Sequence, residues 1–147
     1  MNKALKVFIS SAVVLLLATS AAKFVSSFGH ARILDRNDPI FQVSFRVLFL
    51  IVASLELGVS LFCILSKSIL QRIAMVAWIA TMFLAYRMGM ILVGYNRPCP
   101  CLGNLTDSLH LSPQTATLAT TTILIYLTIG SYLGLVLIGW QMIKNSR

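Results

Sequence analysis

The chain has 147 residues, of which 58% are hydrophobic and only 11% are charged, and its formal net charge is +8. A soluble domain needs about 25% charged residues to cover its surface, so the composition excludes an ordinary water-soluble protein. Nucleic-acid binding, which so basic a chain would otherwise suggest, is also disfavoured. The Lys and Arg residues stand mainly at the ends of apolar runs, where cations face lipid head groups.

Four apolar segments follow one another along the chain, at about 5–22, 47–65, 73–95 and 117–140. Each is long enough for a helix that rises about 1.5 Å per residue to cross a hydrocarbon core of about 30 Å. The sequence therefore predicts an all-α, polytopic membrane four-helix bundle in contact with the lipid bilayer. Residues 1–147 are expected to form a single domain, because the chain is too short for two.

The first segment has two interpretations. Lys3 and Lys6 precede an apolar stretch with small residues at Ser20 and Ala22. This pattern fits either a first membrane helix or a secretory signal peptide that is removed with residues 1–22. Both interpretations place Lys23 on the outer side. Lys and Arg are slightly more numerous on the cytoplasmic side when the N-terminus is inside, so we predict that both termini are cytoplasmic.

Two ionisable residues lie within the second and third segments. Asn37-Asp38-Pro39 predicts a turn and a cap before the second helix, and Glu56 lies near the middle of that helix. Arg87 lies inside the third helix, which the short connection Ser66–Arg72 makes an antiparallel neighbour of the second. Ionisable groups at this depth normally face the bundle interior and pair, and a flexible arginine stem can span the difference in height. We therefore predict an intramembrane Glu56–Arg87 ion pair that fixes the helices.

The connection over residues 96–112 contains the sharpest feature of the sequence, Cys99-Pro100-Cys101. A disulfide between cysteines one residue apart closes a small strained ring and removes little unfolded-chain entropy, so a purely structural crosslink is a poor explanation. Strained disulfides exchange readily, which suits a redox couple. Cys63, in the second helix near the opposite face, lies too far away to be a partner and is predicted to be an ordinary core residue.

Other interpretations of the pair stay open. Cys99 and Cys101 could instead be metal ligands for Cu(I) or Zn(II), or two free thiols in a turn. A metal site would need further ligands, and His110, Met88 and Met90 are the nearest candidates in the sequence.

Two side chains near the pair could assist thiol exchange. The positive charge of Arg97, two residues before Cys99, would raise the thiolate fraction, although head-group anchoring explains this arginine equally simply. His110, and less directly His30, could shuttle protons near a dithiol, although a histidine in a solvated loop is the commoner case.

The fourth segment contains Gly130-x-x-x-Gly134, a small-residue spacing that lets helices approach closely. It predicts close packing either within the bundle or between copies of the chain in a homo-oligomer.

Four short motifs, taken in order, carry a resemblance that covers nearly the whole chain. The chain resembles the bacterial MauE/DoxX-like redox-associated membrane proteins, and the cysteine turn is the most specific part of the match. The motifs are His30-Ala31-Arg32-Ile33-Leu34, Ser54-Leu55-Glu56-Leu57-Gly58, Tyr86-Arg87 and Arg97-Pro98-Cys99-Pro100-Cys101-Leu102-Gly103.

The resemblance implies a four-helix protein of the bacterial inner membrane, with cytoplasmic termini and the Cys99–Cys101 loop in the periplasm. The named family member belongs to methylamine utilisation. It supports the maturation of a disulfide-rich periplasmic dehydrogenase, together with a thioredoxin-like partner.

The residues and the resemblance together predict a thiol–disulfide exchange or disulfide-relay component that acts with a periplasmic thioredoxin-fold protein. No cofactor is predicted. The alternative is a non-enzymatic membrane assembly or metal-handling protein that uses the Cys-Pro-Cys turn as a ligand or docking site.

Overall fold

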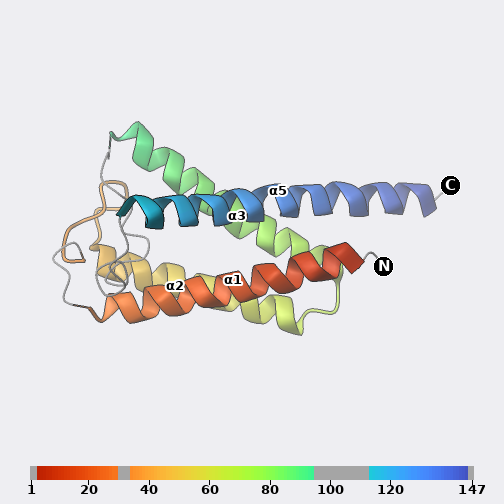
Figure 1. The fold of residues 1–147 in the computed structure, drawn as a ribbon, viewed down its shortest axis with the longest axis horizontal. Helices are drawn as coiled ribbons and strands as arrows, with labels where there is room; N and C mark the ends of the chain where they lie inside the picture. The colour runs from red at the N-terminus through yellow and green to blue at the C-terminus, as the bar shows by residue number, and fades with distance from the viewer. Residues whose placement is uncertain (1–2, 30–33, 95–112, 146–147) are drawn as a thin grey trace.

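The computed structural model describes residues 3–29, 34–94 and 113–145. Within these residues the chain forms the helices α1 (Lys3–Ser27), α2 (Phe45–Leu65), α3 (Ile69–Leu92) and α5 (Pro113–Asn145) (Figure 1). All four are long and apolar enough to cross a membrane. The predicted all-α membrane four-helix bundle is confirmed, and the protein is a multi-pass integral membrane protein.

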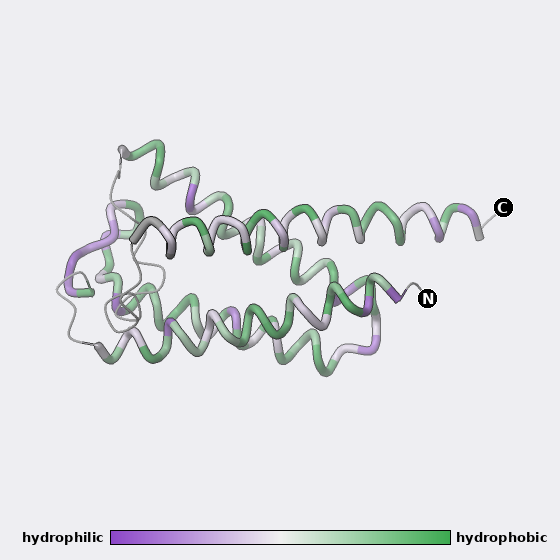
Figure 2. Tube along the Cα trace, in the orientation of Figure 1, coloured by the Kyte–Doolittle hydropathy of each residue, from purple (hydrophilic) through white to green (hydrophobic). Residues whose placement is uncertain are grey.

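The outer surface of the bundle is apolar, as a lipid-facing surface must be. Large hydrophobic side chains remain exposed on every helix, for example Val14, Leu65, Leu92 and Ile143. Figure 2 shows hydrophobic residues along most of each helix, with hydrophilic residues gathered towards the ends and in the connections. Exposing so much apolar surface of a monomer to water would cost free energy, whereas contact with lipid acyl chains would not.

Three of the helices extend beyond the predicted segments, and α3 is shifted, since it begins at Ile69 rather than at 73 and ends at Leu92 rather than at 95. α1 continues to Ser27, so Lys23, expected beyond the end of the first helix, lies within it. α5 begins at Pro113, at the first-turn position that proline tolerates, and ends at Asn145. The boundaries predicted from the sequence were placed at the first charged or polar residue on each side of an apolar segment. Long cationic side chains can extend along a helix towards a polar group, so a lysine does not have to end the helix.

Successive helices run antiparallel, and the first and last described residues lie at the same end of the bundle (Figure 1). α1 packs along α2, and α3 packs along α5, whereas α2 and α3 share far fewer contacts. The short link Ser66–Ser68 joins α2 to α3, and the Arg72 guanidinium closes it by donating to the Ser66 carbonyl. From this link the two helices diverge (Figure 1).

The central core lies where all four helices meet. Cys63 is 1% exposed there, as predicted for a core residue, and its thiol lies 3.6 Å from the Arg72 carbonyl oxygen. The buried residues of this cluster are Ala12, Leu16, Val59, Cys63, Val76, Ile79, Ala80 and Leu127.

The glycines of α5 are used inside the bundle. A Cβ at Gly130 would lie 2.2 Å from the ring of Phe8 on α1, and one at Gly134 would lie 3.2 Å from Ile73 on α3. Because other helices of the same chain cover this face, packing within the bundle is confirmed. Side chains of the same chain occupy the space beside Gly130 and Gly134, and the homo-oligomer stays a prediction.

Candidate functional site

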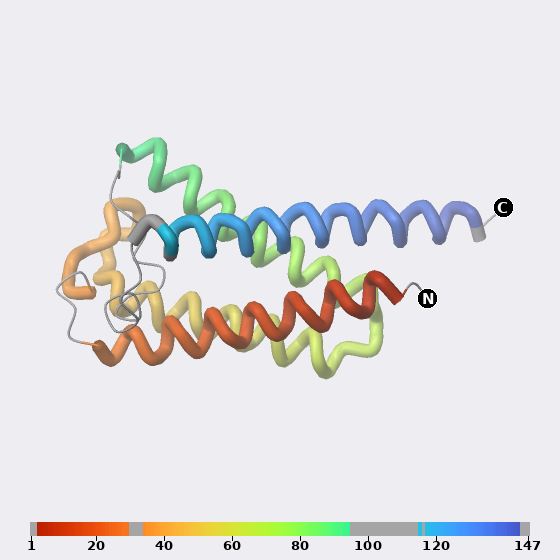
Figure 3. Tube along the Cα trace, viewed as in Figure 1, coloured from red at the N-terminus to blue at the C-terminus, as the bar shows by residue number. Residues whose placement is uncertain are grey.

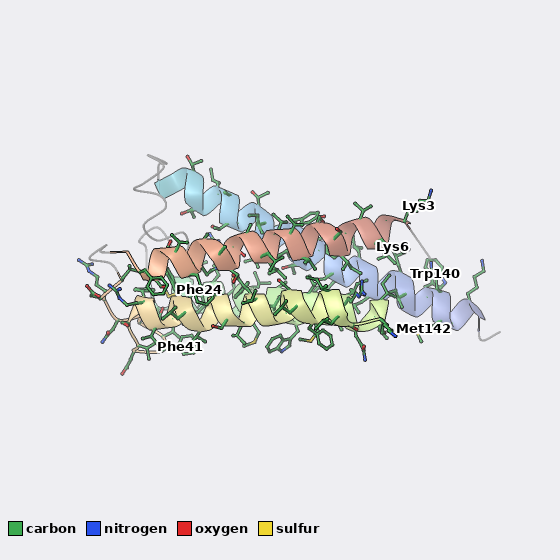
Figure 4. All side chains as sticks on the ribbon, turned by 90° about the horizontal axis from the view of Figure 1, so that it is seen from below. Lys3, Lys6, Phe24, Phe41, Trp140 and Met142 are labelled. Atoms are coloured by element: carbon green, nitrogen blue, oxygen red, sulfur yellow. The ribbon has the colours of Figure 1, made fainter. Side chains whose placement is uncertain are left out.

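The predicted redox residues lie outside the described part of the chain. Arg97, Cys99, Cys101 and His110 all fall in the segment between α3 and α5, and their roles stay predictions. The structure does place the two ends of that segment. α3 ends and α5 begins at the end of the bundle that also carries the connection between α1 and α2 (Figure 3). Figure 4 shows Phe24 and Phe41 at this end, and Lys3 and Lys6 at the opposite end near Trp140.

Glu56 forms an ion pair with Lys23 and not with Arg87. The Lys23 ammonium lies 2.7 Å from Oε1 of Glu56, whose side chain is only 2% exposed. The predicted Glu56–Arg87 pair is therefore wrong. The reason is helix packing: α1 follows α2 along its length, while α3 diverges from α2 towards the end that holds Arg87. Lys23 and Arg87 both lie at heights from which a long side chain could approach Glu56. Lys23 forms the pair because α1 lies beside α2, whereas α3 is farther away at the level of Arg87.

Neighbouring polar groups anchor this pair between α1 and α2. One turn before Lys23, the Ser20 hydroxyl donates to the Ala53 carbonyl across the interface at 2.8 Å. The Ser60 hydroxyl donates to the backbone carbonyl of Glu56. The Lys23 ammonium also lies 5.7 Å from the centre of the Phe83 ring on α3, a cation–π distance. The ion pair thus links α1 and α2 and contacts α3.

The second carboxylate oxygen of Glu56, Oε2, is buried and lies outside the ion pair with Lys23. Among the described residues, no group donates to Oε2, although this atom is shielded from solvent. A buried acceptor that lacks a donor loses the hydrogen bonds that water would give it, so such atoms are rare. A hydrogen-bond donor placed beside Oε2 would therefore stabilise the buried carboxylate.

The ion pair borders a cavity of about 300 Å³ that is lined by residues from all four helices. Its wall is mainly apolar, and its polar lining residues are Thr19, Lys23, Glu56, Tyr86, Arg87 and Thr120. Arg87 is half-buried, and it makes no ion pair with any described residue. An apolar cavity with a few converging polar groups is the usual form of a small-molecule site.

Asp38, in the connection between α1 and α2, binds one of the residues that line the cavity. It is 1% exposed, and its Oδ1 accepts hydrogen bonds from the amides of Ile40 and Phe41 at 2.9 and 2.8 Å. Oδ2 accepts from the Tyr86 hydroxyl on α3, and the rings of Tyr86 and Phe41 stack at 6.0 Å. Asp38 thereby ties the connection before α2 to α3, at the end where α3 has diverged from α2.

The predicted turn at Asn37-Asp38-Pro39 is confirmed, but the predicted cap is wrong. The N-cap of α2 is Ser44, whose hydroxyl accepts from the Val47 amide at 3.5 Å. The Asp38 side chain is already committed to its own turn and to Tyr86, so it cannot cap a helix that begins at Phe45.

Sequence reasoning missed Lys23 and Tyr86 as site residues, and it gave Asp38 a role only in a turn and a helix cap. One signal was available: the whole chain has only 4 acidic residues, so each one in or near a span calls for a specific partner. Nothing in the sequence spacing selected which cation or hydroxyl that partner would be.

Within the described ranges, no group of three His, Cys, Asp or Glu side chains is arranged to hold a metal ion. The predicted alternative metal ligands Cys99, Cys101 and His110 lie outside those ranges. Comparisons with protein-family models, with curated proteins and with solved structures find no match to this chain. The site therefore has to be interpreted from its own chemistry.

Proposed function

We propose that the protein is a membrane-embedded thiol–disulfide exchange component that acts on a periplasmic thioredoxin-fold partner, as its resemblance to the MauE/DoxX-like proteins implies. The observation that carries the proposal is the Cys99-Pro100-Cys101 sequence in the segment that joins two membrane-spanning helices. Cysteines one residue apart form a strained, readily exchanged disulfide, which is a poor structural link and a good redox couple.

The exchange is a two-electron reaction in two displacements. A thiolate of the partner attacks one sulfur of the Cys99–Cys101 disulfide and releases the other sulfur as a thiolate, which leaves a mixed disulfide. The partner's second thiolate then attacks the partner sulfur in that mixed disulfide. This step closes the partner's disulfide and releases the remaining cysteine of the pair as a thiolate. The partner is then oxidised to a disulfide, and Cys99 and Cys101 are reduced to a dithiol. The same steps run in reverse when the partner is the oxidant.

The bundle supports this proposal by the way it holds the ends of the segment. Residues 95–112 connect helices whose adjoining ends lie at the same end of the bundle, opposite the chain termini (Figure 1). With cytoplasmic termini, that end faces the periplasm of a bacterial inner membrane protein, a compartment in which disulfides form and persist. In this topology a soluble periplasmic partner would approach the protein from that end of the bundle.

The proposal is tested by thiol titration of the purified protein at defined glutathione potentials. Of the 3 cysteines, Cys63 is buried in the core, so Cys63→Ser gives a matched background. In that background we expect one two-electron couple. Cys99→Ser and Cys101→Ser should each abolish it. In one of them the remaining thiolate should attack the disulfide of an oxidised thioredoxin-fold protein, release one partner sulfur as a thiolate and stay trapped as a mixed disulfide. Absence of a couple, together with tight stoichiometric Cu(I) or Zn(II), would instead support a metal-handling protein.

Orientation is tested separately in intact cells. A membrane-impermeant maleimide should label Cys99 and Cys101 from outside in the Cys63→Ser background. Labelling only after the cytoplasmic face is opened would contradict the proposed periplasmic exchange while leaving the bundle unchanged.

A further inference from the structure

The internal cavity opens sideways towards the lipid. Ile51 and Leu55 on α2 and Met82 on α3 line the cavity, and their side chains are also 51%, 46% and 55% exposed. They belong to the two sequence-adjacent helices that diverge from their common link. A molecule dissolved in the membrane could therefore enter between α2 and α3 without crossing water.

Among the described residues that line the cavity, one charged side chain lacks an oppositely charged partner. Lys23 and Glu56 pair at 2.7 Å, whereas the half-buried Arg87 guanidinium has no carboxylate partner in the described ranges. The buried carboxylate of Asp38 does not line the cavity, and its oxygens already accept from two backbone amides and the Tyr86 hydroxyl. Charged groups within a membrane bundle are costly and normally pair, so Arg87 offers a position for one negative charge.

A second, independent observation concerns Glu56. Its Oε2 is a buried hydrogen-bond acceptor without a donor among the described residues, since the neighbouring Thr19 hydroxyl donates to the Leu16 carbonyl instead. Lys23 donates to Oε1, and Glu56 is one of the residues that line the cavity. A ligand that supplies a hydroxyl group there would satisfy the orphan oxygen, whereas a second anion there would be repelled.

Arg87 and Glu56 lie at different depths along the helix axes, so the negative charge and the hydroxyl group of a ligand would also lie at different depths. Arg87 is five residues before the end of α3 at Leu92, about 8 Å along the helix axis, and Glu56 is eleven residues into α2 from Phe45, about 16 Å. Both helix ends lie at the same end of the bundle (Figure 1). The negative charge therefore belongs nearer the membrane surface, and the hydroxyl group lies deeper.

We propose that the cavity binds a single-chain anionic lipid that carries a free glycerol hydroxyl. Its phosphate pairs with Arg87, its glycerol hydroxyl donates to Oε2 of Glu56, and its acyl chain leaves between α2 and α3. A volume of about 300 Å³ is at the small end of ligand sites, which suits one chain better than two. The proposal is independent of thiol exchange and can fail without affecting it.

Three lipid probes separate the contribution of the negative charge to binding from that of the hydroxyl group. Each probe is added to the 147-residue protein in a neutral maltoside detergent, and binding is measured by native mass spectrometry. 1-Palmitoyl-lysophosphatidylglycerol carries both the negative charge and the hydroxyl, palmitate carries only the charge, and monopalmitoylglycerol carries only the hydroxyls. We expect one lysophosphatidylglycerol per chain, bound at least about tenfold more tightly than either other probe, since each lost contact is a charge-assisted hydrogen bond. Equal affinity for all three probes would overturn the proposal.

Variants identify the site. Arg87→Gln should reduce the affinity for lysophosphatidylglycerol to that for monopalmitoylglycerol. Arg36→Gln is the matched control, because Arg36 is an exposed arginine at the same end of the bundle and does not line the cavity. Val52→Phe, which places a ring in the cavity, should weaken binding of all three probes. Equal losses in Arg87→Gln and Arg36→Gln, or no loss in Val52→Phe, would show that the lipid binds elsewhere.

Discussion

The ion pair between Lys23 and Glu56 gives the sharpest prediction about stability. In a Lys23→Met variant the carboxylate keeps its burial, at 2% exposure, and loses the ammonium 2.7 Å away. Methionine has nearly the length of lysine, so the change removes the charge and leaves most of the packing. The fold should be strongly destabilised, because an unpaired charge remains inside the bundle.

The magnitude follows from the charge that the variant leaves behind. Breaking a buried ion pair by removing one partner costs about 3–5 kcal/mol, because the remaining charge keeps its burial and loses its counter-ion. We therefore expect Lys23→Met to lower the free energy of unfolding by about 3–5 kcal/mol.

The assay is reversible unfolding by SDS in mixed micelles, followed by far-ultraviolet circular dichroism. Lys6→Met is the matched control, because Lys6 lies on the same helix with an exposed side chain and without an ion pair to a described residue. This control should change the free energy of unfolding by less than about 0.5 kcal/mol. If Lys23→Met is no more harmful than Lys6→Met, the pair does not exist in the folded protein.

A double variant separates a lost pair from lost packing. Lys23→Met with Glu56→Met removes both charges and leaves two unbranched apolar side chains. Replacing a whole buried pair by apolar groups is often neutral or stabilising, so the double variant should recover to within about 1 kcal/mol of the parent. If the two single effects simply add, the reasoning from an abandoned charge is refuted.

Three other variants test individual contacts with the same unfolding assay. Gly130→Ala pushes a methyl group into the aromatic ring from α1 that packs there and should cost about 1–3 kcal/mol, whereas Gly139→Ala, with open space around its Cβ, should be near neutral. Similar effects at the two glycines would contradict the packing. Ser44→Ala removes the cap of α2 and should cost about 0.5–1 kcal/mol, whereas Ser68→Ala, at a cap without a side-chain hydrogen bond, should cost less. Asp38→Ala leaves two backbone amides and a tyrosine hydroxyl without their acceptor and should cost about 2–3 kcal/mol; a change below 0.5 kcal/mol would show that the turn forms without it.

Part of the candidate site could be predicted from the sequence. Glu56 stood out as an acidic residue in the middle of a span, and the expectation that it would be paired is correct. The choice of Arg87 as its partner was wrong, because height along a helix can be counted from the sequence but lateral distance cannot. Asp38 was recognised as a turn residue, yet its bond to Tyr86 joins positions 48 residues apart and has no local signature.

Hydropathy and length alone determined that this is a membrane protein with four spans. A helix is stable across a lipid bilayer only when its apolar segment is long enough to span the hydrocarbon core. The length of that segment can be read from each part of the sequence separately. Only the tertiary structure decided that Lys23 pairs with Glu56 and that side chains of α1 and α3 pack against the glycines of α5. It also decided that the cavity between the helices contains an arginine without an ion-pair partner among the described residues. Those outcomes depend on which helix faces pack together, and packing between segments is set by all of them at once.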